Sequence, residues 1–387
     1  MGPVLGQRKT APNVLVVGAS VPGLSLAHGL RKRGVPVTVY EKREHIAVEE
    51  RKTLLRVDKW ALAGLASCLS ADLYDRCLEL RNALDDALLT HYDTHLCEVH
   101  SVEAAKMSSA PAHTVMDHER LRTILLAGMP DIVRFGHTVT GYRELRDRVG
   151  IRFADGGEAH GDLLVLADGR HSAARDAHLG KLELLDTGLV AIHGHAPIER
   201  ELFTQLPRGF LLHDRPILGP RRTAMTVCAY LPQALSRSAQ LGAAGLAGLR
   251  GYVKWTSVLP ARSELAGYGQ AMVHEIVMEQ VASWHPAVVQ LVTQSVERGL
   301  FTAPIQASVP LQPRRSGLAT TLGSAARVVP SVGVLTDGLA LHDAGRLAVG
   351  IHQDERAGIA GHDQRMLDEG NSVVGQALEQ IERTFNF

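Results

Sequence analysis

Hydrophobic and polar residues near the N-terminus follow the periods of a strand, a helix and a second strand. The run Val14–Val17 is wholly apolar, which is typical of a buried parallel strand. Leu24–Arg33 has apolar residues at helical spacing, Gly34 ends that segment, and Val35–Tyr40 predicts another strand. This order predicts a β-α-β unit, and hence an α/β protein built on a parallel sheet.

The turn between the first strand and the helix consists of small residues. Gly18, Ser20 and Gly23 have the spacing of a G-x-G-x-x-G turn, with Ser at the second position. Glycine permits the tight turn and the close packing of helix on strand, while the helix N-terminus presents unpaired amides to a pyrophosphate. Glu41, at the end of the second strand, can accept a hydrogen bond from a ribose hydroxyl. The stretch predicts a dinucleotide site, and a β-α-β unit of another doubly wound protein is the alternative it leaves open.

The pattern farther along the chain predicts a second group of elements. We expect strands at Leu189–Pro197, Phe210–Arg215 and Thr223–Leu231, and helices at Leu241–Val253, Ala271–Arg298 (interrupted at 284–286) and, as a pair, 354–381. On the first of these strands, His193 and His195 share one face. The segment Lys42–Trp60 lacks glycine and is densely charged, so it predicts a solvated helix or an irregular connection.

Composition narrows the classes of function. At 387 residues the chain exceeds one ordinary domain. Lys plus Arg and Asp plus Glu number 41 each and aromatic residues are 4%, which argues against a nucleic-acid or membrane-surface binder. The four cysteines show no CxxC spacing, and we find no signal peptide and no apolar run long enough for a membrane span. We therefore expect a cytoplasmic protein.

A second motif lies at Asp162–Arg175, where an apolar strand runs into Asp168-Gly169, followed by Ser172 and Arg175. Together with the β-α-β unit it resembles the group A flavoprotein monooxygenases, the para-hydroxybenzoate hydroxylase-like superfamily, whose motif A-D-G-x-x-S-x-x-R lies beside the FAD pyrophosphate. The resemblance implies a Rossmann-like FAD-binding domain (GR2-type) interleaved with a mixed β-sheet substrate domain and C-terminal helices. The implied boundaries are 13–80, 112–185 and 318–387 for the FAD-binding-like domain, and 81–111 and 186–317 for the substrate domain.

Three departures from the family pattern concern the flavin. His118 stands where the family has an Arg near the cofactor. The family's third motif is a strand, then G-D-A-A-H, a Pro- and Gly-rich loop and a helix carrying an Asp. We assign it to Val332–Ala348, with Asp337 as the Asp of the G-D pair, which implies that roughly a dozen residues of the flavin-ring loop are lost. The glycine-free Lys42–Trp60 is a further gap, and so we expect a degenerate FAD site and no functional cofactor, with FAD and NADPH as the alternative.

Three functions remain open at this point. The first is a non-redox enzyme that folds a polyketide-like intermediate for cyclisation, cycloaddition or rearrangement by holding the reacting ends together. The alternative is an FAD- and NADPH-dependent monooxygenase of secondary metabolism, which would hydroxylate or epoxidise a similar substrate. A nucleotide-binding scaffold without chemistry is the third. In each case we expect a small-molecule ligand, no nucleic acid, no membrane, and a monomer or homodimer.

Candidate site residues follow from these motifs. For cofactor contact we expect Gly18, Ser20, Gly23, Glu41, Asp168 and Asp337. For chemistry the candidates are His193, His195, His213 and Asp214, of which the last two form an acid/base pair or, alternatively, a turn after a strand. His193 and His195 lack a third ligand, so they are structural or pocket-lining residues rather than a metal site, and we expect no metal.

Overall fold

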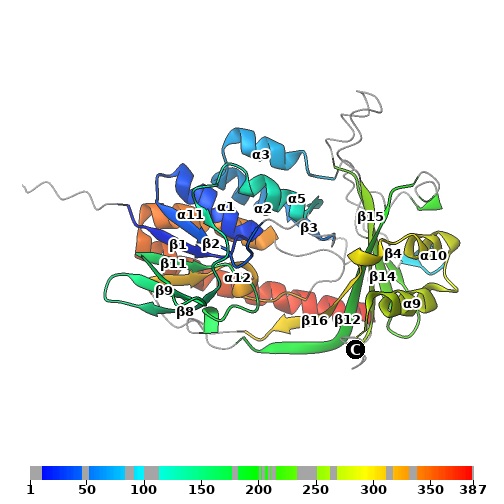
Figure 1. The fold of residues 1–387 in the computed structure, drawn as a ribbon. Coiled ribbons are helices and arrows are strands. Elements are labelled where there is room, and N and C mark those ends of the chain that lie inside the picture. The colour runs from blue at the N-terminus through cyan, green and yellow to red at the C-terminus, as the bar shows by residue number, and fades with distance from the viewer. Residues whose placement is uncertain are drawn as a thin grey trace, which may run out of the picture.

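Two sheets organise the structure, a computed structural model of the chain (Figure 1). The residues that it describes are 11–45, 52–82, 91–99, 113–176, 182–199, 202, 205–207, 210, 215–232, 251–261, 268–310, 317–330 and 338–385. A parallel sheet with its helices lies at one end of the molecule and a mixed sheet forms a wall at the other (Figure 1). The fold is of the predicted α/β class.

Parallel strands form the first sheet. Across the described part of the chain its order is β17 (Ala319–Thr321), β11 (Leu163–Leu166), β1 (Val14–Val17), β2 (Val37–Tyr40) and β7 (Val133–Arg134). The central strand β1 is buried along its whole length, with Leu15 opposite Leu164 on one side and Thr38 on the other. This confirms the predicted β-α-β unit, whose helix is α1 (Val21–Lys32).

Helices pack beside this sheet and against one another. α1 contacts α2 (Lys59–Cys68), α5 (His118–Leu126) and α11 (Gly338–Gln353), and α3 (Ala71–Leu78) packs on α5. α2 and α11 cross closely because glycines lie at the crossing. A Cβ on Gly345 would lie only 2.9 Å from the Cα of Gly64. The close crossing fixes the start of α11, which follows the third motif.

A mixed sheet forms the wall at the other end. Its order among the described residues is β16 (Phe301–Ser308), β12 (Leu184–Pro197), β15 (Tyr252–Pro260), β14 (Ala224–Tyr230), β13 (Arg215–Leu218), β4 (His91–Asp93) and β5 (Glu98–Val99). α9 (Gln270–Val281) and α10 (Pro286–Thr293) cover its outer face, where Ile192, Val253 and Trp255 join their apolar core (Figure 1). The inner face looks toward the parallel sheet (Figure 1).

Smaller elements complete the described chain. β3 (Leu54–Asp58) pairs with β6 (His113–Asp117), and β8 (Val139–Glu144), β9 (Val149–Phe153) and β10 (Glu158–Gly161) form an antiparallel sheet. Two short 3-10 turns lie at Glu297–Gly299 and Gly323–Ala325. The long helix α12 (Glu355–Phe385) runs from β17 toward the mixed sheet (Figure 1).

Three predictions of secondary structure are wrong. The charged segment 42–60 contains the strand β3, with Leu54, Leu55 and Val57 buried against β6. The C-terminal segment, predicted as a pair of helices, is one continuous helix. Each glycine in its interior costs only about 1 kcal/mol of helix stability, which is too little to interrupt it. Residues 252 and 253, predicted helical, begin β15, and 241–250 lie outside the described residues. Most of Phe210–Arg215 also lies outside the described residues, and β13 begins only at its end.

Candidate functional site

Three loops meet at the carboxyl edge of the parallel sheet, after β1, β11 and β17. Gly18 has φ +101°, and a Cβ there would lie 2.6 Å from the carbonyl oxygen of Ala167, so only glycine fits. Gly169 has φ +90°, and its Cβ position is 3.7 Å from Ser324 Oγ in the loop after β17. Ligands of open α/β sheets bind at this edge, so the three loops form the candidate nucleotide site.

Ser20 shapes the start of α1. Its Oγ donates to the carbonyl oxygen of Ala167 at 2.9 Å and accepts from the amide of Gly23 at 3.3 Å, so it caps the helix and ties the turn to β11. Pro22 in the first turn has no N–H. A phosphate at this helix end would therefore be bound by the amides of Ser20 and Val21.

Glu41 lies at the end of β2 and is 7% exposed. Its carboxylate accepts from the amide of Ala19 at 2.8 Å and from the amide of Arg43 at 3.1 Å. Arg122 of α5 donates from Nε to the Ala19 carbonyl at 2.8 Å, and its Nη2 is 4.0 Å from Glu41 Oε2. The carboxylate is thus held rigidly beside the turn, with lone pairs left for a ligand hydroxyl.

Arg122 is a site residue that the sequence interpretation missed. The family pattern directed attention to His118, which begins α5 and whose Nδ1 lies 3.0 Å from Glu119 Oε1. Residues four positions apart share a helix face, so an Arg at position 122 could have been considered from the spacing alone. In the structure this Arg is 4% exposed and supplies positive charge to the nucleotide turn.

Asp168 carries an unsatisfied oxygen. Its Oδ1 is buried and has no hydrogen-bond partner among the described residues. Burial raises the pKa of this carboxyl, and the hydrogen bond of Ser172 and the charge of Arg175 only partly oppose that rise. A buried acceptor without a donor is rare in folded proteins. The site therefore fits a ligand that brings its own donor, such as a hydroxyl of a nucleotide cofactor.

The rest of the middle motif holds its own turn. Ser172 Oγ accepts from the amide of Arg175 at 3.0 Å. Arg175 is 4% exposed, donates to the carbonyl of Arg170 at 2.9 Å and pairs with Asp176 at 2.8 Å. These contacts fix the loop that carries Asp168 and Gly169.

The third motif lies 13 residues earlier in the chain than predicted, with Ser324 in the position assigned to Asp337. β17 pairs in parallel with β11, Thr320 opposite Val165, and is followed by Gly323 at φ +66° and by Ser324. Gly323–Arg327 thus follows the edge strand where G-D-A-A-H is expected, with Ser324 for Asp and Arg327 for His. The prediction of a lost flavin-ring loop is wrong, because the segment 322–337 separates the strand from α11.

A polar strand explains why that motif was misplaced. The apolar run near Val332 has the stronger strand pattern, whereas β17 is Ala-Thr-Thr. Thr320 and Thr321 are fully buried, and α12 contacts both residues: Thr320 Oγ1 donates to Asp363, and His362 Nε2 contacts the backbone carbonyl of Thr321 at 3.1 Å. Such partners come from residues more than forty positions away and leave no local pattern.

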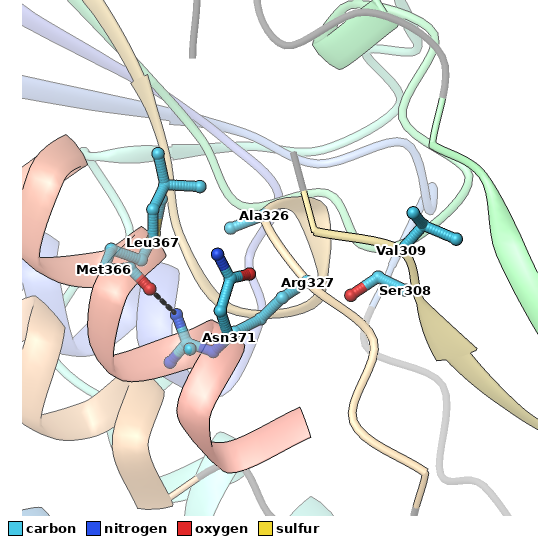
Figure 2. Close-up of a pocket in the computed structure, with 8 residues that line it drawn as sticks. Ser308, Val309, Ala326, Arg327, Met366, Leu367 and Asn371 are labelled. Atoms are coloured by element: carbon cyan, nitrogen blue, oxygen red, sulfur yellow. Dashed lines mark hydrogen bonds between the residues drawn. The ribbon is translucent and has the colours of Figure 1, made fainter. Parts of the chain in front are cut away.

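Arg327 clamps the third motif to the C-terminal helices. Its Nη2 pairs with Asp343 of α11 at 2.9 Å, and the two side chains are 10% and 5% exposed. Its Nη1 donates to the Met366 carbonyl of α12 at 3.5 Å, as Figure 2 shows. The small pocket in Figure 2, between the end of β16 and α12, is lined by this arginine and by Asn371, and we assign it to this clamp.

One group of potential metal ligands lies next to the clamp. His342, Asp343 and Glu369 offer ligand atoms within 4.8 Å of one another. Both acids, however, already pair with arginines, Asp343 with Arg327 and Glu369 with Arg346 at 3.0 Å. The negative charges of both acids are therefore already balanced by arginines, so we do not assign a metal site to this group.

The inner face of the mixed sheet carries a buried polar cluster. His193 and His195 lie on β12, and β15 places Thr256 opposite the first and Lys254 opposite the second. Lys254 Nζ is 3.2 Å from His193 Nδ1 and 3.1 Å from Thr256 Oγ1. His193 Nδ1 and Thr256 Oγ1 are themselves 3.0 Å apart. The ring of His193 also stacks on Phe301, with centroids 4.5 Å apart. The structure thus brings together the two predicted histidines and adds a lysine.

Burial sets the protonation of this cluster. It lowers the pKa of Lys254 to about 7. Burial, and then the charges of Lys52 and Lys254, lower the pKa of His195 to about 4. Burial and Lys254 also hold the pKa of His193 well below its ordinary value. Both histidines are therefore neutral at pH 7, and Lys254 is close to half protonated.

Lys254 also predicts a pH-dependent stability. The groups facing it are His193, His195 and the Cys228 thiol. Between pH 7 and about 10.5 the unfolded chain keeps a proton on this lysine that the folded chain has lost. The free energy of unfolding of the wild type, relative to Lys254→Met, should therefore rise with pH in that window. Denaturant titrations of both proteins at pH 7 and 9 measure it, and a constant difference would contradict the lowered pKa.

A hydrogen bond links the two sites. Tyr252 Oη, on the inner face, donates to Asp117 Oδ2 at 2.8 Å, and Asp117 Oδ1 caps α5 by accepting from the amide of Arg120 at 2.9 Å. The same helix carries Arg122, which contacts the nucleotide turn. α5 therefore spans from the mixed sheet to the candidate nucleotide site.

Three predicted site residues lie outside the described residues, Asp337, His213 and Asp214. In the described chain, no helix is long and apolar enough to cross a membrane.

Comparison with known proteins agrees with this architecture. Residues 16–57 match the family model of an NAD(P)-binding Rossmann-like domain. The dual O-methyltransferase/FAD-dependent monooxygenase elcB of Phaeosphaeria nodorum is 28% identical over 86% of this chain and 39% of its own length. The aurachin C monooxygenase/isomerase of Stigmatella aurantiaca is 24% identical over 84% of this chain and 77% of its own. The chain spans only 23–39% of the dual-function relatives that it matches.

A solved structure shares the fold over nearly the whole chain. Klebsiella pneumoniae HpxO, complexed with FAD and uric acid, superposes with a TM-score of 0.74 at 23% identity, covering 96% of this chain and 88% of its own. The prediction of no functional cofactor is wrong: neighbours of this fold hold FAD, and the loop thought to be missing follows β17. In fold this chain is similar to a solved FAD-binding protein, and the relatives that it resembles in sequence are named as FAD-dependent monooxygenases or monooxygenase/isomerases.

Proposed function

We propose that this chain is an FAD-dependent monooxygenase that uses NADPH as reductant. The convergence of the three loops around the unsatisfied Oδ1 of Asp168 is the observation that carries the proposal. When bound and reduced, FAD supplies the activation of dioxygen that lets one oxygen atom enter an organic substrate.

The residues of the nucleotide turn have distinct roles in this proposal. The amides of Ser20 and Val21 bind the pyrophosphate at the start of α1. Glu41 accepts from a ribose hydroxyl while Arg122 holds it in place, and Asp168 accepts from a further hydroxyl of the cofactor. Asp337 stays a prediction, and Ser324 takes its place in the third motif.

The substrate in this proposal is a small polyketide-type natural product on the inner face of the mixed sheet. Relatives named as monooxygenases support an oxygenation reaction. His193 and His195, both neutral at pH 7, are the proposed polar contacts to the substrate. His213 and Asp214 stay predictions.

Ring formation or rearrangement is a second candidate, as a step that follows oxygenation. A relative named as a monooxygenase/isomerase, matched over 84% of this chain, favours it. We do not propose a non-redox cyclase. That hypothesis rested on the loss of the flavin-ring loop, and residues 322–337 separate β17 from α11 where that loop is expected.

NADPH oxidation coupled to oxygen consumption tests the proposed function. With FAD supplied, the purified chain should oxidise NADPH faster than free FAD does, and oxygen should disappear at the same time. Asp168→Asn keeps the size of the side chain but removes its charge, and it should lower the rate through weaker FAD binding. Rates equal to that of free FAD across a panel of aromatic polyketides would contradict the proposal.

A further inference from the structure

The polar cluster of β12 and β15 lies between two apolar contacts of the inner face. At one end Tyr230, Tyr252 and Cys228 pack with Leu54 and Val115 of β3 and β6. At the other end Leu189, Ala191 and Val258 pack with Ile381 of α12. The cluster occupies the part of β12 and β15 between these two apolar contacts, on the face of the sheet that looks toward the nucleotide-binding half of the molecule (Figure 1).

Lys254 has no counter-ion in this stretch. It is 3% exposed, and among the described residues no carboxylate forms an ion pair with it. Its two partners, Thr256 Oγ1 and His193 Nδ1, are neutral groups and leave one ammonium N–H unused. A buried ammonium without an anion costs free energy, so an anionic ligand that pairs with Lys254 would offset a cost that the protein alone leaves in place.

His195 presents an unused nitrogen beside that ammonium. It is 7% exposed, and its Nδ1 is buried without a hydrogen-bond partner in the described chain. The register places it directly opposite Lys254, so both side chains stand on the same face within reach of one ligand atom. The Asp117 carboxylate, whose charge reaches His195, is already used by Tyr252 and the amide of Arg120.

We propose that Lys254 and His195 form a binding subsite for an anionic oxygen of the substrate: a phenolate, an enolate or a carboxylate. The oxyanion supplies the counter-ion that Lys254 lacks, and His195 donates to it from Nδ1 in the matching tautomer. This inference rests on the proposed function in one respect, namely that the bound anion is taken to be the substrate of the enzyme. It makes Lys254 a specificity residue that selects acidic over neutral substrates.

Three small probes test the subsite: 4-nitrophenolate, benzoate and the neutral nitrobenzene. Their affinities are measured by equilibrium dialysis at pH 7, where Lys254 is close to half protonated, with the FAD-saturated protein and with the protein alone. The wild type should bind at least one anion about tenfold more tightly than nitrobenzene, as one charge-assisted hydrogen bond provides. Preference for nitrophenolate assigns the oxygen to a phenolate or enolate, and preference for benzoate assigns it to a carboxylate.

Lys254→Met removes the charge and keeps the volume. This variant should lose the preference for anions, whereas the exposed Lys59→Met should keep it. Because methionine replaces a buried ammonium, Lys254→Met should melt no lower than the wild type. His195→Leu is the second variant and should weaken anion binding about threefold or more through the lost hydrogen bond.

Equal binding of nitrobenzene and both anions by the wild type would overturn the subsite, as would an unchanged preference in Lys254→Met. FAD retention, read from the same samples, separates this proposal from the proposed function. If FAD does not bind but Lys254→Met loses the anion preference, the subsite stands and the monooxygenase proposal fails. If FAD binds and the wild type shows no preference, only the subsite fails.

Discussion

Gly18→Ala should weaken FAD binding by about a hundredfold, the equivalent of two charge-assisted hydrogen bonds to the pyrophosphate. An alanine Cβ there would lie 2.6 Å from the Ala167 carbonyl, at a backbone φ of +101°. The turn must move away from β11, and the amides of Ser20 and Val21 move with it. Fluorescence quenching of FAD titrated with protein measures the loss.

Gly34→Ala is the matched control for this prediction. Gly34 also has a positive φ, +72°, but a Cβ there meets nothing within 4 Å and the residue lies beyond the far end of α1. It should cost about 1–2 kcal/mol of backbone strain and leave FAD affinity unchanged. If both variants bind FAD equally well, the turn at Gly18 does not hold the cofactor.

Arg327→Leu should destabilise the protein by about 3–5 kcal/mol, because it leaves the buried Asp343 carboxylate without its partner. The arginine joins the third motif to α11 and, through Met366, to α12, so the loop that carries Ser324 should loosen as well. Urea unfolding of the FAD-free chain measures the free energy directly.

The double variant Arg327→Leu with Asp343→Asn decides whether the ion pair is the cause. Removing both charges leaves no buried unpaired ion, so the double variant should regain about half of the loss or more. Arg383→Leu serves as an exposed control, because its pair with Glu379 on α12 is about 65% exposed and contributes at most about 1 kcal/mol. A double variant that is less stable than Arg327→Leu would contradict this account of the clamp.

The nucleotide half of the fold could be predicted from sequence because its signals are local. β1, the turn at Gly18, α1 and β2 occupy one continuous stretch, and each obeys a simple periodicity. The Asp168-Gly169 turn likewise follows its strand directly. Local pattern and tertiary role agree in these segments, so the predicted residues Gly18, Ser20, Gly23, Glu41 and Asp168 come together at one edge of the sheet.

The third motif could not be predicted in the same way. β17 is short and half polar, and partners on α12 make it suitable for burial. The apolar run after Pro330 has a clearer strand pattern and drew the prediction to Asp337. That misplacement led to the prediction of a lost loop. Together with His118 and the glycine-free segment 42–60, it led to the predictions of a degenerate flavin site and no functional cofactor.

Arg122 and Lys254 show a different limit. Each is a charged residue at a position that periodicity alone would assign to the inside, one on an apolar helix face and one within the strand Tyr252–Pro260. A charge at a buried position signals a partner or a ligand, but the partner lies elsewhere in the chain. Glu41 and His195 were predicted, yet their neighbours became evident only in the structure.

The visible spectrum of the purified chain, recorded after incubation with excess FAD and desalting, tests the central claim most directly. The account predicts that oxidised flavin bands survive desalting at a ratio near one FAD per chain, and that Gly18→Ala loses them while Gly34→Ala keeps them. A colourless wild-type protein, folded by circular dichroism, would contradict the assignment of the three loops to an FAD site.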